Sequence, residues 1–244
     1  GTAESSDGVR RLIHGVILHG EQYLKPERRD APTTYYGPDS GVALAIKNTH
    51  QENQRVGVIG LGTGTLAVWG KPGDNYHFYD INPQVVDIAQ SEFTFLKDSK
   101  AKIEISLGDA RLSLEREAPH AFDVLVVDAF SSDSIPVHLI TKEAMAVYFK
   151  HVKPDGAAVF HVTNRFLKLA PVVKSLADDA GLYATLIVDD ADETAFSKTD
   201  WVIVTRDKSL AENAALAQKS TAIDVIPGLR LWTDDFNNLY QILK

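Results

Sequence analysis

The sequence has no cysteine among its 244 residues. Disulfides, thiolate nucleophiles and cysteine-ligated metals are therefore excluded, because each needs a cysteine sulfur. Basic residues are also too few for a nucleic-acid groove: 25 Lys and Arg stand against 33 Asp and Glu, for a formal net charge of −8. Phosphate recognition depends on clustered positive charge, so we expect no nucleic-acid partner.

Long apolar runs are missing as well. No stretch approaches the roughly 20 apolar residues that a membrane span needs, and no secretory leader is visible. The 44% of hydrophobic residues can still bury a large core. The eight histidines show no close ligand spacing such as i, i+4, so we expect no metal. We therefore expect a soluble, cytoplasmic domain.

A glycine-rich turn stands at the centre of the chain. The apolar run that begins at Val56 breaks into glycine at alternate positions, Gly60, Gly62 and Gly64, and then resumes with helix formers. This pattern indicates a buried strand, a tight turn and the first turn of a helix. Glycine lets the backbone approach a ligand closely, and the exposed amides of the following turn face that ligand. We interpret the turn as a nucleotide-type cofactor loop.

Strands and helices alternate after this turn, which predicts an α/β fold with a mostly parallel, seven-stranded sheet. Residues 1–50 are expected to form an N-terminal β-hairpin or lid region, and 51–244 a Rossmann-like domain. The expected strands are 56–59, 76–79, 103–107, 122–127, 157–162, 183–188 and 201–205. The expected helices are 41–47, 84–95, 141–151, 166–180 and a helix-like tail at 234–243.

Four consecutive strands end in functional chemistry: the glycine turn, then Asp80, Asp109 and Asp128. Ligands of open α/β sheets bind outside the carboxyl ends of the strands. An aspartate after a strand often only caps the next helix, but four such ends in a row favour a cofactor site. Asp80 lies twenty positions after Gly60, where a carboxylate can bind both hydroxyls of a ribose. The same spacing is also found in NAD-binding proteins. Against NAD, Thr65 stands at the position of the last glycine in the NAD-binding fingerprint.

The glycine turn, the acid after the second strand and Gly108-Asp109-Ala110 together resemble the class I S-adenosylmethionine-binding fold. The resemblance implies that Asp80 holds the ribose and Asp109 the adenine amino group. It implies a cofactor site made of the following residues: Gly60, Gly62, Thr63, Gly64, Asp80, Ile81, Asp109 and Ala110, with Gln22 from the N-terminal region.

The loop from Asp128 to Pro136 resembles the Asp-Ser-Ser-Asp-Pro signature of the spermidine synthase family. The resemblance implies that Asp128 is the catalytic base and that Asp133 binds the amine; a solvated turn residue is the competing interpretation of Asp133. Tyr35 and Tyr36 fall where the family places aromatic residues at the amine site. Tyr36 is thus a third catalytic candidate, and Tyr35, Tyr36, His19 and Asp133 form the predicted substrate site.

The N-terminal stretch 11–22 and the tail 231–239 are similar to one branch of that family, whose domains often follow membrane-spanning segments. A membrane tether supplied by a segment absent from this chain is therefore left open. The resemblance also implies a homodimer and a small-molecule amine substrate.

Two departures bear on the cofactor. Thr63 stands where the family has an Asp that pairs with the aminopropyl ammonium of decarboxylated S-adenosylmethionine, and Gly37 replaces a Glu after the tyrosine pair. Without that carboxylate, ordinary S-adenosylmethionine becomes an alternative cofactor.

The first hypothesis is an aminopropyltransferase that releases methylthioadenosine. The second is a methyltransferase, or an enzyme that cleaves or cyclises the aminocarboxypropyl arm. The third is a non-catalytic adenosyl-ligand sensor.

Overall fold

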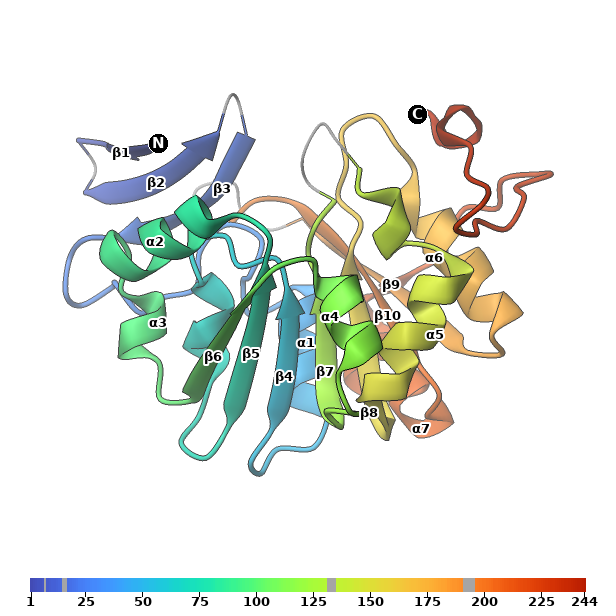
Figure 1. Cartoon of the computed structure of the whole chain (residues 1–244), viewed down its shortest axis with the longest axis horizontal. Helices are drawn as coiled ribbons and strands as arrows, with labels where there is room; N and C mark the ends of the chain where they lie inside the picture. Colours follow the sequence, from blue (N-terminus) through green and yellow to red (C-terminus); the bar gives the residue numbers. More distant parts are fainter. Residues whose placement is uncertain (7, 15–16, 131–134, 191–195) are drawn as a thin grey trace.

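The computed structural model describes residues 1–6, 8–14, 17–130, 135–190 and 196–244. A small antiparallel sheet comes first and has the strand order β1-β2-β3. Its strands are β1 (Thr2–Glu4), β2 (Val9–His14) and β3 (Ile17–Tyr23). The expected hairpin is thus confirmed, with β1 as an added strand. Figure 1 shows this sheet above one end of the main sheet, close to α2 (Pro83–Ser91).

The main sheet has the order β11-β9-β10-β8-β7-β4-β5-β6. Its first five strands in the chain pair in parallel, while β9, β10 and β11 pair antiparallel with their neighbours. The strands are β4 (Arg55–Ile59), β5 (Asn75–Asp80), β6 (Lys102–Leu107), β7 (Phe122–Val127), β8 (Val152–His161), β9 (Tyr183–Asp189), β10 (Thr199–Thr205) and β11 (Ser220–Thr221). The seven expected strands are all present, and the two-residue β11 extends one edge.

Helices cover both faces of this sheet (Figure 1). One face packs against α4 (Ala110–Arg116), α5 (Lys142–His151) and α6 (Leu169–Asp179). The other packs against α1 (Gly41–Asn48), α7 (Lys208–Ala211) and α8 (Ala214–Lys219). The remaining short helices are η1 (Thr65–Trp69), α3 (Phe95–Asp98), η2 (Val137–Leu139) and η3 (Leu239–Ile242).

Strand β7 divides the two cores. All six of its residues are buried, and from Val124 to Val127 successive side chains point to opposite faces. Leu125 and Val127 join the core under α4, α5 and α6, whereas Val124 and Val126 join the core under α1. The one polar residue of this strand, Asp123, lies near its start and binds Arg55 and Lys153, so at the cavity end the first polar side chain is Asp128.

The helix expected at 84–95 is shorter than predicted, because α2 ends at Ser91 and α3 begins at Phe95. The side chain of Gln22 binds Thr94 at this break. Its Oε1 accepts from the Thr94 backbone N–H at 3.0 Å, and its Nε2 donates to Thr94 Oγ1 at 2.9 Å. The backbone amide of Thr94 therefore bonds to β3 instead of a helical carbonyl.

The strand expected at 157–162 begins earlier than predicted, because β8 starts at Val152, directly after α5. In the tail, only η3 is helical within the predicted range 234–243. The segment before η3 is held instead by the buried Trp232 and by a bidentate pair between Arg111 and Asp234.

In the part of the chain that the structure describes, no helix is long and apolar enough to span a membrane. The division into 1–50 and 51–244 remains a prediction.

A buried histidine makes the fold sensitive to acid. The Nδ1 atom of His151 accepts from the backbone N–H of His120 at 3.2 Å, and its Nε2–H donates to the Leu114 carbonyl at 2.7 Å. A proton added to Nδ1 would face the N–H of His120. Burial lowers the pKa of His151, although the bond to Leu114 opposes this shift. The unfolded chain therefore binds this proton before the folded chain does.

We expect the free energy of unfolding to fall as the pH drops below about 6.5, by up to about 1.4 kcal/mol per pH unit for this group. His151→Gln keeps a donor and an acceptor without titrating, so it should reduce the difference between urea unfolding at pH 7.5 and at pH 5.5. His50→Gln is the matched control, because His50 is exposed. An unchanged pH dependence in His151→Gln would contradict the prediction.

Candidate active site

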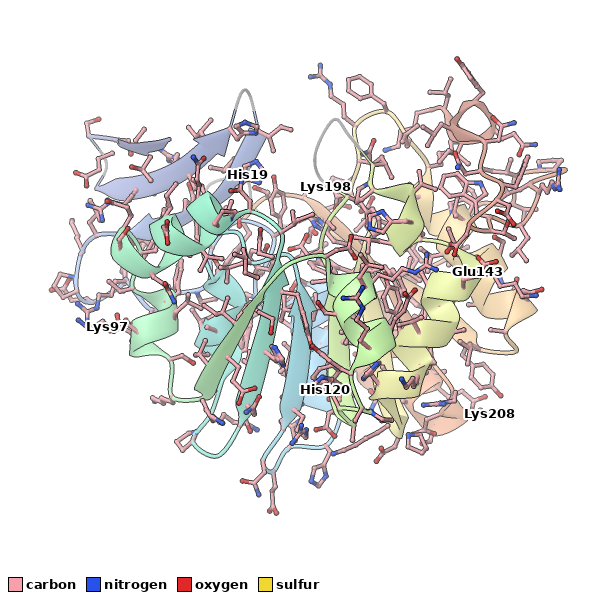
Figure 2. All side chains as sticks on the ribbon, viewed as in Figure 1. His19, Lys97, His120, Glu143, Lys198 and Lys208 are labelled. Atoms are coloured by element: carbon pink, nitrogen blue, oxygen red, sulfur yellow. The ribbon has the colours of Figure 1, made fainter. Side chains whose placement is uncertain are left out.

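A cavity of about 450 Å³ lies outside the carboxyl ends of β4, β5, β6 and β7. Residues of the small sheet form its roof, and residues of α2 and η2 form its sides. Its volume lies within the roughly 300–1,000 Å³ of small-molecule sites. Figure 2 shows His19 at this end of the main sheet, whereas His120 lies near the start of β7 at the opposite end.

Two glycines of the turn are required by close packing. Gly60 has φ +99°, and an added Cβ would lie 2.2 Å from the backbone oxygen of Asp128. Gly62 has φ +54°, and its Cβ would lie 2.9 Å from the carbonyl oxygen of His19. Both glycines line the cavity. The turn is thus wedged between the end of β7 and the small sheet, and only glycine fits there.

Asp80 lines the cavity and supports the glycine turn. Its Oδ2 accepts from the backbone N–H of Leu61 at 2.9 Å, and its Oδ1 from that of Asn82 at 2.9 Å. Each carboxylate oxygen can accept a further bond, so both remain able to receive the hydroxyl groups of a ribose. Ile81 is 71% exposed and lines the same wall, where it offers an apolar surface.

Asp109 caps α4 and is paired with a residue that the sequence patterns did not indicate. Its Oδ1 accepts from the Leu112 N–H at 3.0 Å, and its Oδ2 lies 2.7 Å from His138 Nε2. Burial raises the pKa of Asp109, but the bonds to Leu112 and His138 outweigh this effect and lower it overall. The carboxylate is thus ionised at neutral pH. Ala110, the first residue of α4, also lines the cavity.

Asp128 sits at the back of the cavity, with its side chain only 8% exposed. Tyr36 donates its hydroxyl hydrogen to Oδ2 at 2.5 Å, and His161 Nδ1 lies 2.8 Å from Oδ1. Burial, followed by the charge of Asp128, raises the pKa of Tyr36 well above its usual value. The phenol therefore stays protonated and serves as a hydrogen-bond donor to the carboxylate.

Tyr35 and His19 complete the side of the cavity next to Asp128. Burial and the charge of Asp128 raise the pKa of Tyr35, so its hydroxyl is also neutral. Burial and the neighbouring His14 lower the pKa of His19, while Asp128 and Asp80 partly oppose this. His19 is therefore neutral at pH 7 and adds no positive charge to the site.

Three predicted cofactor residues lie outside the cavity lining. Thr63 is buried, its Oγ1 lies 2.8 Å from Thr65 Oγ1, and its side chain packs against Gly20. Gln22 is bonded to Thr94 and to the carbonyl of Arg29. Gly64 caps η1 at φ +80°. All three join the glycine turn or β3 to the scaffold.

Asp133, the predicted amine-binding residue, lies outside the described residues. The sequence analysis missed His138 and His161. His161 could have been found from the same signal as the aspartates, because it ends β8, the strand next to β7. Among the described residues, no three His, Cys, Asp or Glu side chains gather to hold a metal ion.

Carboxylates are the main charged side chains of the site. The described part of the lining contains the carboxylates of Asp80, Asp109 and Asp128 and no Lys or Arg side chain. Like charges in a partly buried cavity repel an anionic ligand group and attract a cationic one. The site is therefore suited to a ligand that carries positive charge.

Solved structures share this architecture. Human methyltransferase-like protein 13 in complex with SAH matches with a TM-score of 0.54 at 17% identity, covering 80% of this chain and 93% of that one. A probable spermidine synthase from Corynebacterium glutamicum matches with a TM-score of 0.69 at 14% identity, covering 98% of this chain and 94% of that one. The fold is that of class I S-adenosylmethionine-dependent methyltransferases, as predicted.

No protein-family model matches the chain. A probable polyamine aminopropyl transferase from Bifidobacterium longum is 27% identical over 157 residues, which make up 63% of this chain and 33% of the relative. A polyamine aminopropyltransferase from Vibrio vulnificus is 29% identical over 155 residues, 61% of this chain and 51% of the relative. The chain spans about half or less of these relatives' length. Their names confirm the predicted resemblance to the spermidine synthase family.

The wedge at Gly60 can be tested by substitution. Gly60→Ala places a Cβ against the backbone of Asp128 and adds the strain of positive φ, whereas Gly228→Ala, at φ +72° with nothing within 4 Å, adds only the strain. We expect about 1–2 kcal/mol of destabilisation for Gly228→Ala and clearly more for Gly60→Ala. Urea unfolding of both variants measures this, and equal losses would rule out the close packing.

Asp80→Asn should weaken the binding of methylthioadenosine by about 1–3 kcal/mol, because an amide offers one acceptor oxygen in place of two charged ones. Isothermal titration calorimetry measures the affinity. Asp155→Asn, an exposed change at the start of β8, is the control. Unchanged affinity in Asp80→Asn would remove this carboxylate from the ligand site.

Proposed function

We propose that this chain transfers an aminopropyl group from decarboxylated S-adenosylmethionine to a small amine and releases methylthioadenosine. The observation that carries this proposal is the carboxylate of Asp128, which faces a cavity free of Lys and Arg side chains among its described residues. The names of the two sequence relatives support it, although the chain spans only part of their length.

The residues present fit an adenosyl group. Asp80 offers acceptors for ribose hydroxyls, Asp109 offers an acceptor for the adenine amino group, and Ile81 offers an apolar surface for the ring. Gly60 and Gly62 let the backbone approach the ligand closely. The sulfonium of the bound donor supplies the electrophilic carbon.

Asp128 accepts a proton from the amine, and Tyr36 orients the carboxylate of Asp128. The amine nitrogen forms a bond to the carbon next to sulfur, the carbon–sulfur bond breaks, and its electron pair stays on sulfur. The lone pair for this bond becomes free when the ammonium form of the amine gives a proton to Asp128. Tyr36 stays protonated and keeps one carboxylate oxygen oriented by its hydrogen bond. The low exposure of Asp128 limits the access of water, which would otherwise compete with the amine.

The charge of the lining favours the decarboxylated donor over S-adenosylmethionine itself. Ordinary S-adenosylmethionine carries a carboxylate on that arm, and the described lining residues offer it no Lys or Arg side chain. The decarboxylated donor carries only an ammonium on that arm. Thr63 does not bear on the choice of donor, because its side chain packs on Gly20 and does not reach the cavity. Methyl transfer is therefore the weaker alternative.

The other assignments remain proposals: amine binding by Asp133, Tyr35 and His19, a homodimer, a cytoplasmic location, and a membrane tether supplied by a segment outside this chain. The chemistry named here requires no metal.

Incubation of the chain with decarboxylated S-adenosylmethionine and putrescine, followed by mass spectrometry, tests the proposal. We expect equal amounts of methylthioadenosine and aminopropylated amine. Asp128→Asn should lower kcat by about 10²–10⁴-fold, because it removes the proton acceptor, and should leave methylthioadenosine binding nearly unchanged. Asp155→Asn should retain full activity.

Other products in this experiment would indicate a different function. Adenosylhomocysteine formed from S-adenosylmethionine would establish methyl transfer and overturn the proposal. Methylthioadenosine without an aminopropylated amine would indicate cleavage or cyclisation of the arm. Binding of methylthioadenosine without any product would indicate a sensor. Equal loss of binding and turnover in Asp128→Asn would assign Asp128 a structural role.

A further inference from the structure

The carboxylate of Asp128 has a second partner that lies behind the cavity. His161, the last residue of β8, is 1% exposed at its side chain, and its Nδ1 lies 2.8 Å from Asp128 Oδ1. We propose that His161 is a positioning residue that donates a hydrogen bond to Asp128 and keeps this carboxylate oriented as the proton acceptor. This inference rests on the proposed function for its catalytic consequence, but not for its hydrogen bond.

The surroundings of the His161 ring prevent it from turning. The ring stacks on Trp201, with centroids 4.4 Å apart and planes inclined by 15°. The Nε2 atom lies 3.2 Å from the hydroxyl oxygen of Thr199. A rotated ring would lose the bonds at both nitrogens and the stacking contact at once. Trp201 is fully buried, so the ring of His161 packs against a side chain of the core.

The proton on the imidazole follows from these partners. An ionised carboxylate has no hydrogen to give, so the bond to Asp128 requires the hydrogen on His161 Nδ1. In a neutral ring, Nε2 is then an acceptor, and the Thr199 hydroxyl can donate to it. The chain Thr199–His161–Asp128 thereby selects one tautomer, as the partner of the second ring nitrogen does in other histidine sites.

The result is a carboxylate held from two sides. Tyr36 donates to Oδ2 and His161 donates to Oδ1, and each oxygen keeps a lone pair for the amine. A buried carboxylate without such donors would be expensive to keep ionised. Two fixed donors therefore compensate for the burial of the Asp128 carboxylate and set its direction toward the cavity.

Two variants separate this role from simple packing. His161→Phe keeps the ring that stacks on Trp201 but removes the donor, so we expect kcat to fall by about 10²-fold while the affinity for methylthioadenosine stays the same. His161→Asn loses the ring but places an amide donor near the former Nδ1, so it should recover a large part of kcat. A role limited to packing predicts the reverse order of the two variants and would overturn the inference.

A measurement that needs no turnover tests the hydrogen bond itself. Long-range ¹H–¹⁵N spectra of ¹⁵N-histidine-labelled protein, with the His161 signals assigned by their loss in His161→Phe, report which nitrogen carries the proton. We expect the proton on Nδ1 and a shift of this signal in Asp128→Asn. An unprotonated Nδ1 would overturn the inference even in an active enzyme. If the spectra agree but the wild type transfers no aminopropyl group, the proposed function fails and the hydrogen bond stands.

Discussion

A nearly buried carboxylate sets the main constraint on this molecule. Asp128 follows a strand that is buried on both faces, so its charge lies at the edge of the hydrophobic core. A charge in that place is tolerated only when hydrogen-bond donors surround it. Tyr36 supplies one donor from the segment before α1, and His161 supplies the other from β8. Segments far apart in the chain thus meet at a single group.

Two more carboxylates, those of Asp80 and Asp109, lie at the same end of the sheet as Asp128. Asp80 and Asp109 both accept hydrogen bonds from backbone amides, and Asp109 is also paired with His138. Because the described lining adds no Lys or Arg side chain, the field in the cavity favours a cationic ligand. A sulfonium with an ammonium arm satisfies that field better than a ligand that also carries a carboxylate.

The small sheet does more than cover the cavity. Gln22 bonds to Thr94 between α2 and α3, and Gly20 lies against Thr63 of the glycine turn. These contacts join the sheet to the two segments that border the predicted cofactor site. Gln22 and Thr63, which the sequence predicts to contact the cofactor, therefore connect parts of the fold, because their polar groups are hydrogen-bonded within the protein.

The amino-acid sequence was enough to predict the alternation of strands and helices, the glycine turn and the three aspartates at strand ends, because apolar periodicity and glycine spacing are local properties. It could not distinguish Thr63 and Gln22, which face the scaffold, from Gly60 and Asp80, which line the cavity. The pairings of His161 with Asp128 and of His138 with Asp109 join residues 33 and 29 positions apart. Only the order of strands in the sheet brings such residues together, since side-chain direction and long-range contact arise from tertiary packing.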